Sequence, residues 1–387
     1  MKYAINALVL LLGSVLLAAA SNNSWAAASC RFDTGSNSVL LTVPLSPPII
    51  SAGADIPIGT IIYQGRWTNA PTVSVFCESS VAGFLYNWAV GIEQAPLTLS
   101  GLNSGPFAGA VYQTNIPGIG VAISRQNNSA AATLGAFGYR SNDLTFDDTV
   151  GIALFGSATR YISLIKIGPL TPGSYAIAAS SFPMASDNMV SSPAGEPIQG
   201  LPLQLNRVTF TGNLTVTAQT CTTPDVNVVM GAYDIREHFR SINSTTPWID
   251  ASISLQNCPT FHSFYNQTNT TTFMNFNTGS AAATTSINNS IGVRLTPTTA
   301  VKDAANGIMD IDSSLLGAAS GVGIQIGWGL NNQTPTLFNF SSEQAMTLPK
   351  DGSPTIRVPL SALYIQTDTV ATAGRADGKV VFTINYY

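Results

Sequence analysis

The side chains that could do chemistry in this chain are suited to binding sugars. Aromatic rings stack on the apolar faces of sugars, while amide and carboxyl groups hydrogen-bond the hydroxyls. Residues 67–94 contain both kinds of side chain, namely Trp67, Tyr86, Asn87, Trp88, Glu93 and Gln94. A β-sandwich also needs buried aromatic mass, which favours the core over a binding site for each of these aromatic residues.

Signals for catalysis are weak. The two histidines are His238 and His262, and a Ser/His/Asp triad requires a histidine positioned as the base. The adjacent acids Asp147 and Asp148 lack the ligand spacing of a calcium-binding loop. The sequence therefore predicts no enzyme, no cofactor and no metal site.

The composition favours an exported β protein. Charged residues make up 9% of the 387 residues, the formal net charge is −4, and Ser, Thr and Asn supply most of the polarity. Nucleic-acid binding requires a basic face, which this balance does not provide. We therefore expect no nucleic-acid partner.

The N-terminus has the pattern of a signal peptide. Lys2 supplies a positive charge, residues 7–20 are apolar but too few to span a bilayer, and Ala26 and Ala28 form an A-x-A cleavage site. We therefore assign residues 1–28 to a signal peptide, with cleavage after Ala28 making Ser29 the first residue and cleavage after Ala26 as the alternative.

The cysteines Cys30, Cys77, Cys221 and Cys258 are expected to form disulfides in an exported protein. No C-x-x-C spacing indicates a zinc site. Four cysteines allow three pairings, and the sequential pairing would place one bridge in each half of the chain.

Short apolar runs separated by Gly, Pro, Asn and Ser predict an all-β chain of sandwich type. In the first half, strands are expected at 60–63, 72–76, 161–167, 174–180 and 203–217, and a long loop at 183–202. In the second half, alternating Val226, Val228 and Met230 predict a first strand. The chain divides into two domains, residues 29–217 and 218–387.

The last residues also form a strand pattern. Val380, Phe382, Ile384 and Tyr386 alternate on one face of the expected strand. An exposed apolar strand is an aggregation hazard unless another strand pairs with it. The pattern indicates either the last strand of a complete sandwich or a strand that awaits a partner chain.

Gly374, fourteenth from the end, and the penultimate Tyr386 resemble the C-terminus of chaperone–usher pilus subunits. The layout of both halves resembles the two-domain tip adhesins of that family, such as those of type 1 pili. The resemblance implies two immunoglobulin-like β-sandwich domains, with the C-terminal one an incomplete pilin fold that lacks its last strand. It also supports the pairing Cys30–Cys77 and Cys221–Cys258.

The resemblance implies partners as well. A periplasmic chaperone, and later an adjacent pilus subunit, would add a strand to a groove marked by Gly374, Val380, Phe382, Ile384 and Tyr386. The outer-membrane usher would export the assembled chain to the bacterial surface. Cys30 follows the expected cleavage site almost directly, which leaves no donor arm and implies a place at the fimbrial tip.

The same resemblance indicates where a host glycan or matrix protein would bind. The corresponding positions are Ser29, Glu78 and a loop that contains Asp187 and Asn188. The segment after Cys77 lacks the aspartates of mannose-specific relatives, so the resemblance does not identify the receptor, which could be another glycan or a matrix protein. The alternatives are a minor pilus subunit without receptor binding and a secreted glycan-active enzyme.

Overall fold

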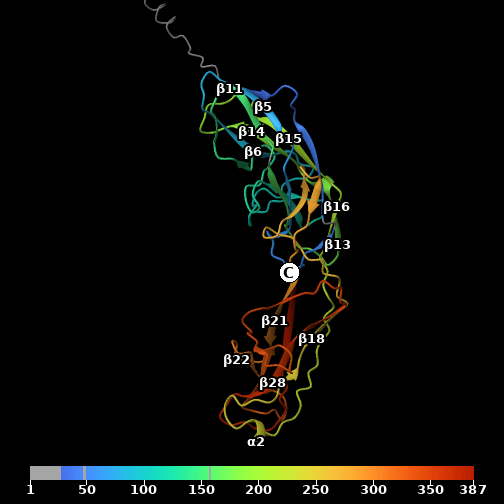
Figure 1. Cartoon of the computed structure of the whole chain (residues 1–387). Coiled ribbons are helices and arrows are strands. Elements are labelled where there is room, and N and C mark those ends of the chain that lie inside the picture. The colour runs from blue at the N-terminus through green and yellow to red at the C-terminus, as the bar shows by residue number, and fades with distance from the viewer. Residues whose placement is uncertain (1–27, 47–48, 157) are drawn as a thin grey trace, which may run out of the picture.

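Residues 28–46, 49–156 and 158–387 are described in a computed structural model, and their regular secondary structure is almost entirely β-strand (Figure 1). The helical elements in this part of the chain are α2 (Ile235–His238) and the 3-10 turn η1 (Ala179–Ser181). The predicted all-β class is confirmed. The expected signal peptide lies outside the described residues, except for Ala28.

The N-terminal half forms four sheets. Their orders are β1-β5-β11, β10-β6-β14-β15-β2, β20-β19-β4-β12-β8-β7 and β13-β16-β3, and β9 pairs with β6. The strands from this half are β1 (Ser29–Phe32), β2 (Val39–Pro44), β3 (Ile49–Ser51), β4 (Ile61–Thr68), β5 (Val73–Glu78), β6 (Phe84–Gln94), β7 (Tyr112–Gln113), β8 (Ile119–Ser124), β9 (Tyr139–Arg140), β10 (Leu144–Phe146), β11 (Val150–Phe155), β12 (Thr159–Lys166), β13 (Ser174–Ala178), β14 (Met184–Ser191), β15 (Leu203–Thr211) and β16 (Asn213–Thr217).

The C-terminal half forms three sheets, with orders β17-β28-β24-β23-β22, β18-β27 and β26-β21-β29, and β25 pairs with β24. The strands after residue 217 are β17 (Ile249–Asp250), β18 (Ile253–Gln256), β19 (Thr271–Asn275), β20 (Ser280–Ala282), β21 (Ser290–Pro297), β22 (Val301–Asp303), β23 (Ile308–Asp310), β24 (Val322–Trp328), β25 (Thr336–Leu337), β26 (Gln344–Thr347), β27 (Thr355–Val358), β28 (Leu360–Gln366) and β29 (Val380–Tyr386).

Each half has its own large apolar core. In the N-terminal half, Trp67 of β4 packs edge-on against Phe210 of β15, with ring centroids 5.6 Å apart. In the C-terminal half, Val293 of β21 and Val358 of β27 are fully buried. The predicted disulfide pairing is confirmed, because Cys30 is bonded to Cys77 and Cys221 to Cys258.

One segment of the C-terminal half belongs to the sheet of the N-terminal half. β19 pairs in parallel with β4, and the ring of Phe273 is buried in the N-terminal core, 5.6 Å from the ring of Tyr63. Gly65 makes room for that ring, since an added Cβ would lie 2.1 Å from Phe273 Cζ. The division of the chain into two domains at residue 218 stays a prediction. Residues 271–275 lie after that division in sequence but belong to the N-terminal sheet.

Three local predictions need correction. The expected strand 203–217 is divided at Gly212, whose φ of 85° turns the chain from β15 into β16. The expected loop 183–202 contains the buried strand β14, whose polar residues gave it the sequence pattern of a loop. The strand expected at 226–230 is not formed, because no neighbouring strand pairs with that segment in the described part of the chain.

Candidate functional site

The final strand of the described chain is paired along one edge alone. β29 pairs with β21 throughout, from Pro297↔Val380 to Ile291↔Tyr386. Among the described residues no strand pairs with its other edge. Figure 1 marks the C-terminus, where β29 ends, at the junction of the two halves.

The hydrogen-bond pattern identifies which backbone groups lie on the open edge. Ser290 and Tyr387 exchange both backbone hydrogen bonds, at 2.8 and 3.1 Å. In an antiparallel pair such residues alternate with residues whose backbone groups point away from the partner. The N–H and C=O groups of Val380, Phe382, Ile384 and Tyr386 therefore point toward the open edge.

The side chains of these four residues point into the C-terminal core, yet the core covers three of them incompletely. Val380, Phe382 and Ile384 are half-buried, whereas Ile291, Val293 and Leu295 of the paired strand β21 are 0–3% exposed. Tyr386 is the exception, at 4%. The core is therefore less completely covered along the open edge of β29 than along β21.

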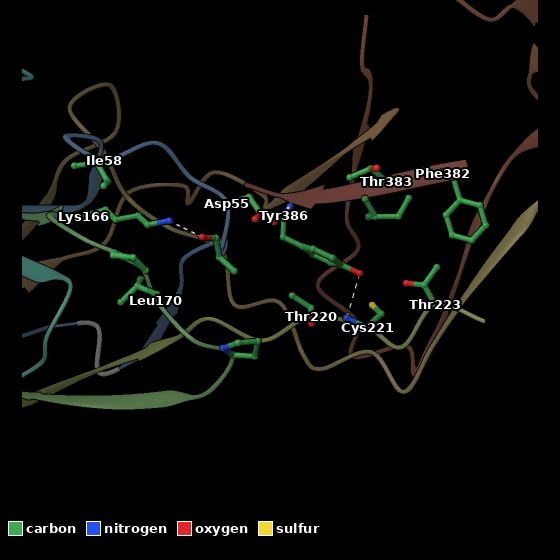
Figure 2. Close-up of a pocket in the computed structure, with 14 residues that line it drawn as sticks. Asp55, Ile58, Lys166, Leu170, Thr220, Cys221, Thr223, Phe382, Thr383 and Tyr386 are labelled. Carbon is green, nitrogen blue, oxygen red and sulfur yellow. Dashed lines mark hydrogen bonds between the residues drawn. The ribbon is translucent and has the colours of Figure 1, made fainter. Parts of the chain in front are cut away.

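A groove of about 910 Å³ borders this edge (Figure 2). Its lining from the C-terminal half includes Phe382, Ile384 and Tyr386, together with Thr220 and Thr223 of the connecting segment. The N-terminal half also contributes to the lining with Ala54, Asp55, Ile58, Lys166 and Leu170. The groove thus lies between the two halves at one end.

The segment that follows Cys221 carries exposed apolar side chains. Residues 223–234 form no strand, and Val226 and Val229 are 38% and 79% exposed. The segment is held at its start, where the backbone N–H of Cys221 donates to the Tyr386 hydroxyl at 3.1 Å. Burial raises the pKa of Tyr386, while the bond from Cys221 acts in the opposite direction.

Two predicted groove residues lie outside its lining. Gly374 packs against residues 317–319, where an added Cβ would come within 2.5 Å of Ala319 N. This close approach of two backbone segments explains why position 374 is a glycine. Val380 packs against the C-terminal core without lining the groove. The structure thus brings Phe382, Ile384 and Tyr386 together in the groove, and the sequence did not indicate Asp55 or Lys166.

The four predicted receptor residues form two separate pairs. Ser29 of β1 lies opposite Glu78 of β5, with Ser29 Oγ 3.4 Å from Glu78 Oε1, and Arg31 forms an exposed ion pair with the same carboxylate. In the neighbouring strand Val150 is paired with Glu78, and Ile152 and Leu154 are 52% and 68% exposed. Ser29 and Glu78 therefore border an exposed apolar face of β11.

Asp187 and Asn188 lie in β14, not in the expected loop, and are 1% and 4% exposed. The expectation of a loop fails because buried partners satisfy these polar side chains within the strand. Arg160 forms a buried ion pair with Asp187, and Asn206 Nδ2 donates to Asp187 Oδ2 at 3.1 Å. A role for them in receptor binding stays a prediction.

A polar depression of about 480 Å³ lies elsewhere on the N-terminal half, lined by Asn87, Ser141, Asn142, Asp143, Ser192, Pro193 and Ala194. Asp143 accepts hydrogen bonds from Ser192 Oγ and from Asn87 Nδ2, the latter at 2.9 Å. These bonds lower the pKa of Asp143 and keep it charged. The sequence singled out Asn87 but not Asp143 or Ser192, which lie in separate loops and carry no common motif.

The three aromatic candidates for sugar binding pack in the N-terminal half. Trp67 is 1% exposed, and Tyr86 and Trp88 pack edge-on against Phe155, with centroids 6.0 and 5.5 Å away. Glu93 accepts a hydrogen bond from Ser186 Oγ. These aromatic residues are therefore explained as core residues.

Neither a metal centre nor a membrane-spanning helix is found within the described ranges. No three His, Cys, Asp or Glu side chains gather there into a group that could hold a metal ion. The helices among these residues are all too short or too polar to cross a bilayer. His238 packs edge-on against Tyr233, with centroids 5.1 Å apart.

Comparison with known proteins gives one match at the level of a family. Residues 208–387 match the family model of fimbrial proteins, which confirms the resemblance of this part of the chain to a fimbrial subunit. No curated protein sequence matches the chain.

Three solved structures align with weak similarity. The CupB6 tip adhesin from Pseudomonas aeruginosa is 16% identical, with a TM-score of 0.31, over 92% of this chain and 94% of that one. The receptor-binding domain of the MrkD1P adhesin of Klebsiella pneumoniae is 17% identical, with a TM-score of 0.28, over 50% and 98% of the two chains. The CsuC–CsuE chaperone–tip subunit complex of Acinetobacter baumannii is 12% identical, with a TM-score of 0.24, over 92% and 100%. At these TM-scores the alignments carry no argument by themselves.

Proposed function

We propose that this chain, whose residues 208–387 match fimbrial proteins, is a fimbrial tip adhesin that joins its pilus by accepting a strand from a partner. The observation that carries the proposal is the open edge of β29, with three of its inward side chains incompletely covered. A periplasmic chaperone would fill this edge first and an adjacent pilus subunit later, after export by the outer-membrane usher. The chain would thus pass through the periplasm to the fimbrial tip.

The physical basis is the free energy gained by strand addition. An added strand satisfies open backbone groups and covers the half-buried side chains of Phe382 and Ile384. Full burial of such a side chain contributes roughly 1.5–3 kcal/mol relative to full exposure, so completing a partial burial contributes a fraction of that. Thr220 and Thr223 of the connecting segment line the same groove and would face the added strand.

Capture by the chaperone tests this part of the proposal. In Phe382→Glu a charge replaces an apolar groove side chain, so we expect loss of co-purification with the co-expressed periplasmic chaperone. Val381→Glu is the matched control, because Val381 lies on the opposite face of the same strand and is 51% exposed. Undiminished capture of Phe382→Glu would contradict strand addition at this edge.

The N-terminal half would bind the host receptor. The polar depression around Asp143 offers a charged carboxylate and an amide to the hydroxyls of a glycan. The apolar face of β11 beside Ser29 and Glu78 offers a different surface, suited to a matrix protein. Both surfaces belong to the half of the chain that the fimbrial family match does not cover.

Two variants separate these receptor classes. The chaperone-bound full chain would be applied to glycan and matrix-protein arrays, because β19 of the C-terminal half completes the N-terminal sheet. Asp143→Asn should abolish glycan retention, and Ile152→Asp should abolish retention by a matrix protein, with exposed Glu196→Gln as the control for both. An array without any retained ligand would favour a minor pilus subunit, and turnover of an arrayed glycan would favour an enzyme.

A further inference from the structure

The N-terminal half closes one end of the open edge of β29. The backbone N–H of Asp55 donates to Tyr386 O at 3.1 Å, and Asp55 Oδ2 accepts from the backbone N–H of Tyr386 at 2.9 Å. Asp55 thus occupies both outward backbone groups of Tyr386, as a residue of a neighbouring strand would. Figure 2 shows Asp55 beside Tyr386, at the end of the groove where Lys166 also lies.

The backbone around Asp55 is packed closely against the end of β29. A Cβ added to Gly53 would lie 2.1 Å from Tyr386 O, so the backbone of Gly53 lies directly against the carbonyl of Tyr386. Lys166 Nζ donates to Ala54 O and holds the same segment from β12. Burial lowers the pKa of Lys166, an effect that the Asp55 carboxylate partly offsets.

Buried hydrogen bonds fix this segment to the C-terminal half. Asn289 Nδ2 donates to Ser51 O at 3.1 Å and to Tyr387 O at 3.3 Å. Ser51 Oγ also accepts from the backbone N–H of His262 at 2.8 Å. Asn289 and Ser51 are 3% and 4% exposed, so these bonds lie away from solvent. Residues 51–55 are therefore held in place relative to the end of β29.

We propose that residues 53–55 are a stop that sets the register and the end of the incoming strand. The occupant is an extended segment of a partner chain with apolar side chains two residues apart. The incoming strand pairs with β29 from Val380 to Ile384. It ends before Tyr386, because Asp55 already bonds to the backbone N–H and C=O of that residue. This inference rests on the proposed strand addition and assigns to the N-terminal half a part in partner recognition.

The chemistry of the groove supports this description of the occupant. At the middle of the open edge the lining is apolar, with Phe382 and Ile384. Toward the stop the lining is mixed, with polar Asp55 and Lys166 beside apolar Ile58 and Leu170. The incoming strand should therefore place alternating apolar side chains over Phe382 and Ile384.

Peptides of graded length test the stop on the full chain in complex with its chaperone. The probes are synthetic peptides of five, seven and nine residues with alternating valine and threonine, and the measurement is the apparent affinity with which each displaces the chaperone. In the unmodified chain we expect the longer peptides to bind within about twofold of the shortest, because Asp55 already occupies the next outward backbone groups, those of Tyr386.

The variant Asp55→Ala removes the carboxylate that occupies the N–H of Tyr386. We expect the seven- and nine-residue peptides to gain about fivefold over the shortest in this variant, in line with one additional backbone hydrogen bond. Asp148→Ala is the control, because Asp148 is exposed and lies two residues before the edge strand β11, at the far end of the N-terminal half (Figure 1). It should behave as the unmodified chain does.

The outcomes separate the stop from the strand addition on which it rests. If no peptide displaces the chaperone from any form of the chain, strand addition at this groove fails and the stop fails with it. If the peptides displace the chaperone but Asp55→Ala shows the same length dependence as the unmodified chain, the stop alone is overturned. Amide exchange adds a second readout: Tyr386 should already be protected before a peptide binds, and Asp55→Ala should remove that protection.

Discussion

Replacing Gly65 and Phe273, singly and together, tests whether residues 271–275 are a structural part of the N-terminal half. The Phe273 ring is fully buried in the N-terminal core, although it comes from the C-terminal half of the sequence. Its removal in Phe273→Ala should destabilise the N-terminal half by about 3–5 kcal/mol. Gly65→Ala introduces a Cβ only 2.1 Å from the ring, and this overpacking should cost about 1–3 kcal/mol.

The double variant carries the decisive information. Once the Phe273 ring is gone, the methyl group of an alanine at position 65 no longer collides with it and fills part of the void. The two costs should therefore combine to about 0.5–3 kcal/mol less than their sum, the range found for side chains in direct contact. Leu316→Ala is the control, because Leu316 is 98% exposed and its removal should change stability by less than about 0.5 kcal/mol.

Native-state amide hydrogen exchange in β4 is the assay, because it reports the opening of this sheet separately from the rest of the chain. Additive costs within about 0.5 kcal/mol would refute the contact between Gly65 and Phe273. Unchanged exchange of β4 amides in Phe273→Ala would refute the larger claim that the crossing segment completes the N-terminal sheet.

Three further variants test individual side chains. Asp187→Ala leaves the buried Arg160 without its carboxylate and should cost about 3–5 kcal/mol in urea unfolding, and a cost below about 1 kcal/mol would contradict the buried ion pair. The lowered pKa of Asp143 contributes stability that is present above the ordinary aspartate pKa and is lost as pH falls through the folded-state pKa. The stability difference between the unmodified chain and Asp143→Asn should therefore shrink from pH 5 to pH 2, whereas a constant difference would count against this carboxylate. Tyr386→Phe removes the acceptor for the Cys221 N–H and should cost about 1–3 kcal/mol in thermal unfolding, and an unchanged melting temperature would argue against that bond.

The features that could be predicted from the sequence are those that depend on local pattern. The alternation of Val380, Phe382, Ile384 and Tyr386 predicted a final strand, and β29 occupies those positions. The pairing of the four cysteines was left open by their number and was chosen by the family resemblance. The structure confirms both the strand and the pairing.

The expected loop around Asp187 shows where local pattern misleads. Ser186, Asp187 and Asn188 form a polar run that indicates solvent exposure, yet all three are buried in β14. Their partners, such as Arg160 on β12, lie on other strands. A sequence pattern does not specify which distant groups will meet, so it cannot distinguish a buried polar strand from a loop.

The sequence by itself determined the all-β class, the inward face of the final strand and the cysteines available for disulfides, because periodicity and residue type act over a few neighbouring positions. Tertiary structure alone decided that Phe273 completes a core more than two hundred residues away in the chain, at Tyr63, and that Asp55 occupies the end of β29. Those contacts join segments that share no local pattern. They are set by which strands become neighbours when the two cores pack.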